Sequence, residues 1–274
     1  MNLNKNVDSD FIIQQCFLGY QYRKVRKQLY QVEADIPKKL ITLYYLNNET
    51  INLDYLKEAF IKKYIKNECA LEDVHNKEEK DGMKVMYEYM YTTNDEFSIY
   101  SIMDFHKMLY SKTPYPEYAG HFRNYDVYLP GTGTELSEWS MIWPNIKSLE
   151  LEVREQIKKG KKLKNSKSID KLFSYINECV ILKCKLIKIH PFQDGNGRTI
   201  RCFLNKLFEI AGIPPVYIKE NERTEYHKAM NKANHENNYQ FIIQFYYYKI
   251  CDSIVELDIN ERLRNEKLKV NIYK

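Results

Sequence analysis

Apolar side chains recur at helical spacing through most of this chain, and the pattern is clearest on either side of residue 190. Ser168 can cap a helix that continues to His190, and a second helix is expected to begin near Gly197 and to end at Gly212. The apolar positions of the two helices are Leu172, Phe173, Ile176, Cys179, Val180, Leu186 and Ile187, then Ile200, Phe203, Leu204, Leu207 and Phe208. The pattern therefore predicts a loop between two core helices.

The rest of the chain is also mostly helical by the same criterion. Further helices are expected over 54–65, 80–91, 99–110, 145–158, 222–234 and 239–257. Residues 118–134 differ, because aromatic and β-branched residues bounded by Pro and Gly favour a short β-hairpin. We expect a mainly α fold with an N-terminal helical extension (1–54), one domain (55–250) and a C-terminal helix or tail (251–274).

Composition and charge indicate an ordinary soluble protein. The chain is 44% hydrophobic and 29% charged, with a net charge of +5, and no apolar run is long enough to span a bilayer. Six cysteines lie apart without a CxxC pair, which favours the reducing cytoplasm over a disulfide or metal framework. Residues 158–167 hold six lysines but no interleaved aromatic residues, so a solvated loop is favoured over a nucleic-acid site.

The loop between the two central helices, HPFQDGNGRTIR at 190–201, concentrates the polar chemistry. His190 has an ordinary pKa close to working pH and is the candidate base. Asp194 offers one carboxylate beside a phosphate site, which suits Mg²⁺. Gly195 and Gly197 are expected to take positive φ and to expose N–H groups at a helix N-terminus, where anions bind.

The remaining loop residues are candidates for nucleotide binding. Asn196 can add a side-chain donor, and Arg198 offers a planar fork for phosphate. Phe192 is expected to anchor the loop in the core. Nucleotide-binding residues are therefore expected among Phe192, Gly195, Asn196, Gly197, Arg198 and Arg201.

The loop resembles the signature of the Fic family, HPFx(D/E)GNGRxxR, at every fixed position. The resemblance extends over roughly residues 55–250, and it implies a Fic-type helical bundle. Gly120, His121, Phe122 and Arg123 lie in a segment similar to the family's β-hairpin flap, which implies docking of a target protein by strand addition.

The activity implied by the resemblance is transfer of AMP from ATP to a Tyr, Thr or Ser hydroxyl of a protein, which could be this chain itself. His190 would deprotonate the hydroxyl, and Asp194 would hold Mg²⁺ on the α- and β-phosphates. Asn196 and the loop amides would stabilise charge on the α-phosphate, and Arg198 would grip the β- and γ-phosphates.

The segment 67–75 resembles the inhibitory helix that many Fic proteins carry before the core domain. Glu72 would then pair with Arg201 and obstruct binding of the γ-phosphate. The segment departs from the family's (S/T)xxxE(G/N) pattern at Glu68 and Asp73. Breaking the Glu72–Arg201 pair would free Arg201 for ATP.

Several alternatives stay open at this point. The loop could run the reverse reaction, with Glu72 activating water to remove AMP, or it could sense nucleotide within a non-catalytic binding module. Tyr226 and Asn234 are candidate contacts of the base, and the target protein and a homo-oligomeric state are not readable from the chain.

Overall fold

The structure, a computed structural model, describes residues 37–38, 41–42, 44–45, 53–129, 134–254 and 256. Within these residues the regular elements are helices, and no strand is present. The predicted mainly α fold is therefore confirmed. Most of the predicted extension (1–54) and of the C-terminal segment (251–274) lies outside the described residues, although 251–254 continue a helix that starts at 240.

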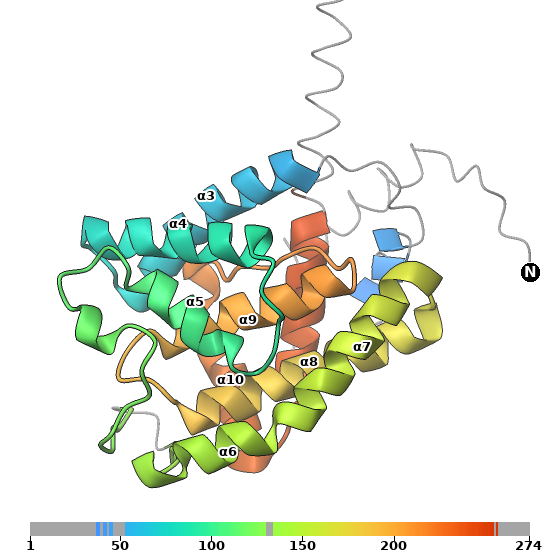
Figure 1. The fold of residues 1–274 in the computed structure, drawn as a ribbon. Coiled ribbons are helices and arrows are strands. Elements are labelled where there is room, and N and C mark those ends of the chain that lie inside the picture. The colour runs from blue at the N-terminus through green and yellow to red at the C-terminus, as the bar shows by residue number, and fades with distance from the viewer. Residues whose placement is uncertain are drawn as a thin grey trace, which may run out of the picture.

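Most of the helices follow one another with short connections, and the long exception joins α5 to α6 (Figure 1). Their bounds are Leu53–Glu72 (α3), Lys77–Thr92 (α4), Ser101–Leu109 (α5), Ile142–Ser148 (α6), Glu150–Ser166 (α7), Ile169–Ile189 (α8), Asn196–Ile210 (α9) and Arg223–Glu236 (α10), followed by the helix from 240. Three short 3₁₀ turns cover Pro116–Tyr118 (η2), Trp139–Met141 (η3) and Glu220–Glu222 (η4). None of the helices in the described part is long and apolar enough to cross a membrane.

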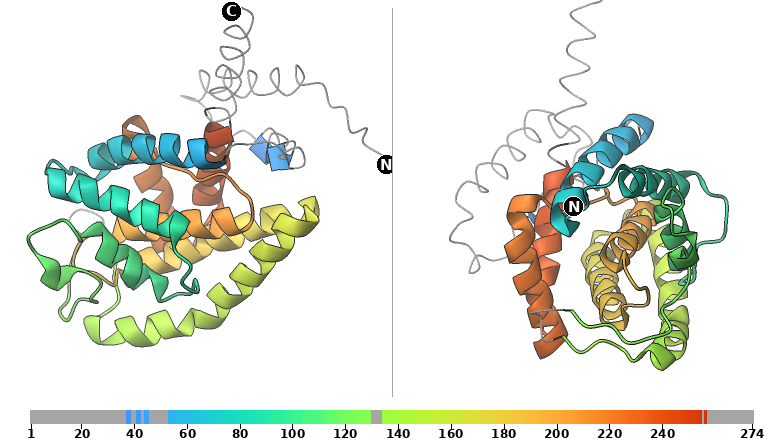
Figure 2. Two further views of the ribbon diagram at one scale, coloured as in Figure 1. Left: turned by 45° about the horizontal axis from the view of Figure 1, so that its top comes forward. Right: turned by 90° about the vertical axis from the view of Figure 1, so that its left-hand side faces the viewer.

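The helices α8 and α9 form the centre of the domain, and the other helices surround them (Figure 2). Helix α8 packs against α6, α7, α9 and α10, and α9 packs against α4, α5 and α7. Both helices bury side chains on most of their surface, in agreement with the apolar pattern that predicted them. The loop that joins them is consequently held between rigid elements.

The ends of these two helices differ in detail from the prediction. Ser168 takes the N-cap position of α8, but its side chain makes no capping hydrogen bond. At the other end, His190 is left-handed (φ 51°), and its N–H donates to the Leu186 carbonyl over 3.0 Å. Helix α9 begins at Asn196, one residue before the expected start. The catalytic candidates therefore lie on a tight turn closed by a left-handed residue.

The predicted β-hairpin over 118–134 is not formed as paired strands in the described residues, and its tip at 130–133 lies outside them. Backbone N–H groups of both arms donate to the end of α8 and the loop after it, and the bonds that link the arms involve side chains, from Arg123 to the Ser137 carbonyl and from the Trp139 N–H to Asp126. The Arg123 N–H donates to the Pro191 carbonyl (2.9 Å), and the Ser137 N–H donates to the Lys188 carbonyl (3.2 Å). These two N–H groups are therefore not available for the backbone hydrogen bonds that would pair the arms as antiparallel strands.

Helix α3 is attached to the domain by aromatic packing and by one carboxylate. Phe60 and Tyr64 pack against Tyr87, with ring centroids 5.4 and 4.2 Å apart. Glu256, from the C-terminal helix region, accepts hydrogen bonds from Tyr217, Lys219 and Lys63, the last of which lies on α3. These contacts fix the first part of α3.

Replacing Glu256 by Gln is expected to lower the free energy of unfolding at pH 7 by about 1–3 kcal/mol. Burial raises the pKa of Glu256, but Lys219, Tyr217 and Lys63 lower it to a net value of about 2. An unfolded glutamate titrates near 4.5. The stabilisation is therefore present above that pH and is lost as the pH falls toward 2. Urea denaturation should show a smaller difference between wild type and variant at pH 3 than at pH 7, and an equal difference would contradict the assignment.

Candidate functional site

The loop between α8 and α9 is closed by two left-handed residues, His190 (φ 51°) and Gly195 (φ 71°). Inside it, the Asn196 side chain accepts from the Phe192 N–H (2.8 Å) and donates to the Phe192 carbonyl (2.7 Å). The amide group predicted to reach a ligand thus ties the loop to itself. A Cβ at Gly195 would lie 2.9 Å from Leu109 and Tyr110, so this position has no room for a side chain.

Phe192 anchors the loop to the core of the domain. Its ring is fully buried and stacks on His106 with centroids 3.9 Å apart. The prediction that Phe192 anchors the loop is confirmed. Its grouping with the nucleotide-binding residues stays a prediction. The ring faces the core, and the Phe192 N–H donates to Asn196.

His106 is a supporting residue that the sequence did not single out. Its Nδ1 accepts from the Gly120 N–H (2.9 Å), so Nε2 carries the proton and donates to the Asp194 carbonyl (3.0 Å). Burial lowers the pKa of His106 to about 4, which keeps the ring neutral. A histidine among apolar positions of 99–110 was the available signal, but its partners are distant in sequence.

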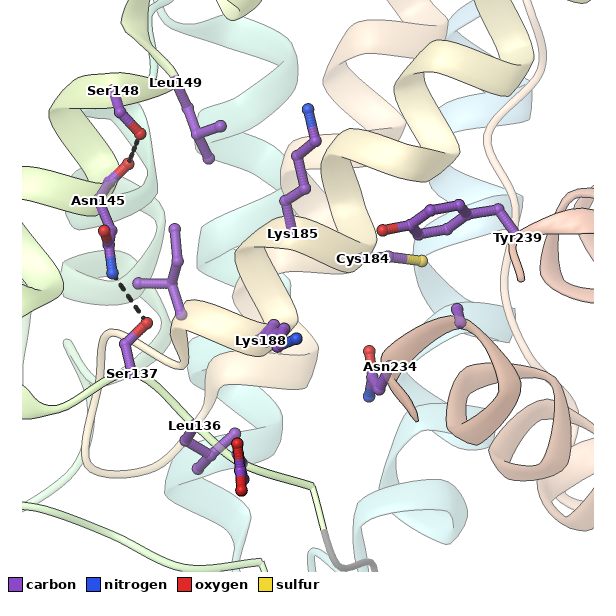
Figure 3. A pocket seen from close by; sticks show the side chains of 13 residues that line it. Leu136, Ser137, Asn145, Ser148, Leu149, Cys184, Lys185, Lys188, Asn234 and Tyr239 are labelled. Atoms are coloured by element: carbon purple, nitrogen blue, oxygen red, sulfur yellow. Dashed lines mark hydrogen bonds between the residues drawn. The ribbon is translucent and has the colours of Figure 1, made fainter. Parts of the chain in front are cut away.

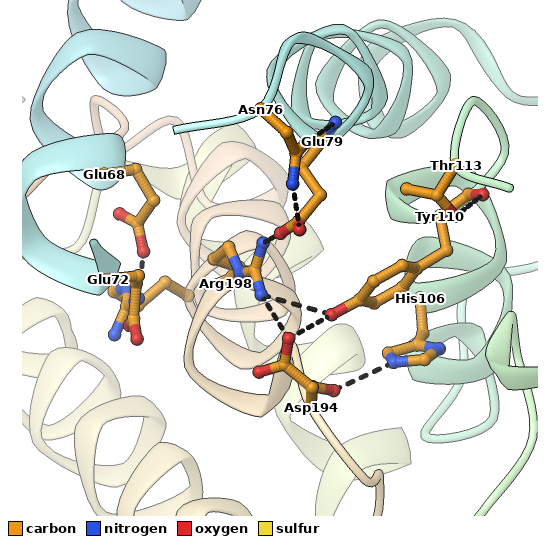
Figure 4. Close-up of polar contacts among 10 residues, drawn as sticks. Glu68, Glu72, Asn76, Glu79, His106, Tyr110, Thr113, Asp194 and Arg198 are labelled. Atoms are coloured by element: carbon orange, nitrogen blue, oxygen red, sulfur yellow. Dashed lines mark hydrogen bonds and ion pairs between the residues drawn. The ribbon is translucent and has the colours of Figure 1, made fainter. Parts of the chain in front are cut away.

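Asp194 and Arg198 belong to one polar network (Figure 4). The Tyr110 hydroxyl donates to Asp194 Oδ2 (2.7 Å), and Arg198 Nη2 contacts both that oxygen (2.9 Å) and the Tyr110 oxygen (3.1 Å). Arg198 Nη1 pairs with Glu79, whose carboxylate also accepts from Asn76 at the start of α4. The Arg198 guanidinium is buried and is held from three directions.

The donor set at Asp194 fits a magnesium ion shared with phosphate. Partial burial raises the pKa of Asp194, but Arg198 and the Tyr110 hydroxyl lower it below its usual value, so the group is ionised. Its side chain is 71% exposed, which leaves the carboxylate accessible. No cluster of three or more metal-ligating side chains occurs among the described residues. One carboxylate completed by phosphate and water is a common arrangement for Mg²⁺.

Arg201 is buried as well, and it contacts two glutamates of α3. Its Nη2 pairs with Glu72, as predicted, and also with Glu68, which the sequence marked only as a departure from the family pattern. Figure 4 shows both carboxylates on the same side of Arg198. Glu68 is fully buried, whereas the Glu72 side chain is one third exposed (33%). The guanidinium is thus enclosed by negative charge.

Gly197 is required for this arrangement, although for a different reason than expected. The predicted positive φ is wrong, because Gly197 is helical within α9. A Cβ at this position would come within 2.5 Å of Glu72 Oε1 and 2.9 Å of the Arg201 guanidinium. The absence of a side chain therefore lets the Glu72–Arg201 pair lie directly on the first turn of α9.

His190 is neutral in this environment. Burial lowers the pKa of His190 to about 4, against a smaller opposing effect of the Ile187 backbone. The Nδ1 atom is buried and has no hydrogen-bond partner of good geometry among the described residues. The His190 carbonyl accepts from Arg123 Nε over 2.9 Å, which fixes the backbone of the residue.

The backbone of the four predicted flap residues is bound to the rest of the domain and does not present a free strand edge. The N–H groups of Gly120 and Arg123 bond inward to His106 and Pro191, so they are not available to a target strand. Phe122 packs between Phe192 and Trp143, with centroid distances of 5.6 and 5.8 Å. His121 is exposed.

One pocket includes Asp194 of the site, and another is lined by none of the loop residues 190–201. The first, of about 260 Å³, is lined by Glu79, His106, Tyr110, Tyr115, Tyr118, Gln193 and Asp194. The other, of about 380 Å³, lies between α6, α8 and α10 and includes Lys185, Lys188 and Asn234 (Figure 3). Of the two candidate base contacts, Asn234 lines this second pocket, whereas Tyr226 is buried with its hydroxyl bonded to Lys183 (2.6 Å).

Comparison with known proteins matches residues 96–208 to the Fic/DOC family. The protein adenylyltransferase Fic of Drosophila erecta is 32% identical over 165 residues, which are 59% of this chain and 30% of that protein. The protein adenylyltransferase fic-1 of Caenorhabditis elegans is 33% identical over 141 residues, or 52% and 25% of the two proteins. The chain covers only 14–30% of the length of these and similar curated relatives.

Solved structures share the fold. A Fic domain containing signaling protein from Bacteroides thetaiotaomicron superposes with a TM-score of 0.63 at 14% identity, over 80% of this chain and 95% of that one. Fic-1 from C. elegans gives a TM-score of 0.53 at 19% identity, over 93% and 74% of the two chains. At these identities the similarity concerns the fold alone.

Replacing Tyr110 by Phe is expected to raise the pKa of the Asp194 carboxyl, because the hydroxyl that donates to its ionised form is removed. Carboxyl ¹³C chemical shifts followed against pH measure this pKa. Tyr115→Phe is the matched control, since the Tyr115 ring neighbours Tyr110 but its hydroxyl makes no contact with Asp194 in the network. An unchanged Asp194 pKa in the Tyr110 variant would refute the network.

Proposed function

Because the chain carries a Fic/DOC family domain over residues 96–208, we propose that it is a protein adenylyltransferase, which transfers AMP from ATP to a protein hydroxyl. The curated relatives that match about half of the chain bear this name. The observation that carries the proposal is the position of His190. His190, whose ring is neutral and half-buried, directly follows the last residue of α8. The loop that it begins ends at the N-terminus of α9.

His190 would act as the general base. Its pKa of about 4 leaves the imidazole neutral at pH 7, so it can accept the proton of a Tyr, Thr or Ser hydroxyl. The hydroxyl oxygen then forms a bond to the α-phosphorus. The bond from that phosphorus to the bridging oxygen breaks, and pyrophosphate leaves. The low pKa weakens the base, but it also keeps the base unprotonated across the physiological range.

The first turn of α9 would bind the phosphates. Free N–H groups at a helix N-terminus and the helix dipole both favour an anion. Gly197 has no side chain, so a phosphate could approach its backbone closely at the place where Glu72 Oε1 now lies. Arg201 lies on the next turn and would contact the terminal phosphates once its glutamates are displaced.

Asp194 would hold Mg²⁺ together with the nucleotide, and the ion would neutralise phosphate charge. Arg198 and Tyr110 fix the direction of this carboxylate. Since Arg198 is buried and bonded to Glu79, we propose that it orients Asp194 in the resting protein, and that gripping the β- and γ-phosphates would require release from Glu79.

Glu72 would act as a brake on the reaction. Its carboxylate occupies the Arg201 guanidinium and lies against the backbone of Gly197, where a terminal phosphate would otherwise bind. The Glu72 carboxylate is also partly exposed to water, which supports a second candidate function. This is the reverse reaction, in which Glu72 activates water to remove AMP. Incubation with an AMP-modified target would separate the two functions by loss or gain of the adduct.

We also propose the cytoplasm as the location. The described cysteines are all free thiols, and most of them are buried in the core, as expected in a reducing compartment.

Replacing His190 by Ala is expected to reduce AMP transfer by about 10²-fold or more, the size of a general-base contribution. Binding of ATP should change little, because the α9 N-terminus and the arginines remain. Mass spectrometry after incubation with ATP and Mg²⁺ measures transfer to the protein itself or to a target, and calorimetry measures binding. His75→Ala is the control, since His75 is exposed and paired only with Asp73. Full transfer by the His190 variant would refute its role as the general base, whereas ATP binding without transfer by the wild type would leave only a nucleotide-sensing role for the loop.

Replacing Glu72 by Gly is expected to increase AMP incorporation, because the carboxylate that lies against the backbone of Gly197 is removed. The increase is measured with labelled ATP under the same conditions as for wild type. Unchanged incorporation together with unchanged ATP affinity would count against a braking role of Glu72.

A further inference from the structure

Two carboxylates compete for one guanidinium at the end of α3. Glu68 and Glu72 lie four residues apart, on successive turns of the helix, and both contact Nη2 of Arg201. The Arg201 and Glu68 side chains are buried, at 6% and 0% exposure. Arg201 is therefore faced by two acidic side chains, although one carboxylate is enough to neutralise it, inside a region with little water.

Two hydrogen-bonding atoms are left over at this contact. Glu68 Oε2 and Arg201 Nε are both buried and have no hydrogen-bond partner among the described residues. One is an acceptor and the other is a donor. A guanidinium pairs best with a carboxylate through two parallel N–H···O bonds. Sharing Nη2 with Glu72 leaves the Glu68–Arg201 pair with one such bond.

The charge state of Glu68 depends on whether the Glu72 carboxylate lies beside it. Burial raises the pKa of Glu68, and repulsion by the Glu72 carboxylate raises it further, against the attraction of Arg201. Removing Glu72 removes that repulsion, so Glu68 ionises more readily beside the same guanidinium. A small turn of the guanidinium would then bring Nε to Oε2 and complete a two-bond pair.

We propose that Glu68 is a second inhibitory carboxylate, which takes over Arg201 when Glu72 is lost or displaced, so that Arg201 is free for a phosphate only after both glutamates are removed. The proposal rests on the proposed function, in which Arg201 contacts the terminal phosphates of ATP. It means that a change at Glu72 alone releases the nucleotide site only in part.

The test compares wild type, Glu72→Gly, Glu68→Gln and the double variant E68Q/E72G. The affinity for AMPPNP with Mg²⁺ is measured by calorimetry, and AMP transfer from ATP by mass spectrometry. We expect Glu68→Gln alone to bind like wild type, since Glu72 still holds Arg201. The double variant should bind AMPPNP at least about tenfold more tightly than Glu72→Gly, a non-additive gain typical of residues that share a partner.

Glu58→Gln is the matched control, because Glu58 lies on the same helix but pairs with Lys62 at the surface. Equal AMPPNP affinities of Glu72→Gly and the double variant would overturn the proposal. Circular dichroism checks the fold. If E68Q/E72G does not fold, E68T/E72G replaces it, because the threonine hydroxyl can still accept from Arg201, and the same tenfold criterion applies.

The two readouts separate this inference from the proposed function. If Glu72→Gly transfers AMP at least as fast as the double variant and both bind AMPPNP with equal affinity, the role of Glu68 is overturned. The enzyme assignment then stands. The expected order of affinities without transfer by any variant supports the role of Glu68 and overturns the assignment. Absence of AMPPNP binding to every variant overturns both.

Discussion

The buried charge of Arg201 is the constraint on which the arrangement of the site depends. A guanidinium at this depth needs a counter-ion, because a lone buried charge is strongly destabilising. Here the counter-ions come from α3, which precedes the residues matched to the Fic/DOC family, so this helix is tied to α9 through the charge of Arg201. Any anion that binds the first turns of α9 must therefore compete with carboxylates that also hold the structure together.

The same principle extends to the second arginine. Arg198 is paired with Glu79 from the start of α4, and its other contacts are Asp194 and Tyr110. Each arginine of the motif is thus matched by an acid from a different helix, and the positive charge of the motif is balanced without a ligand. The exposed Asp194 carboxylate and the backbone of α9 remain as the accessible polar groups. Electrostatic preorganisation in this site lies in the supporting residues as much as in the motif.

The sequence predicted the central helices and the loop well, because apolar periodicity and a dense motif are local signals. It also predicted the Glu72–Arg201 pair, through a resemblance. It did not reveal His106 or Tyr110, since a single side chain on an apolar face gives no sign of a partner about 85 residues away. The Gly197 conformation and the hairpin were misjudged for a related reason. Gly197 is helical because α9 begins one residue earlier than expected, and the bonds of the 118–134 segment to the loop and to the end of α8 are tertiary contacts that no local propensity encodes.

The two glutamates of α3 differ in how easily they can move. Glu72 is the last residue of the helix, and Asp73 beyond it is left-handed (φ 58°), so fraying of one turn is enough to withdraw the Glu72 carboxylate. Glu68 lies one turn deeper, and displacing it would unwind the helix next to the aromatic packing of Tyr64. A partner that binds the end of α3 could therefore release the first carboxylate at little cost, whereas release of the second requires loss of core packing. In the proposed release of Arg201, the depth of each acid, rather than its charge, would set the order in which the two glutamates leave.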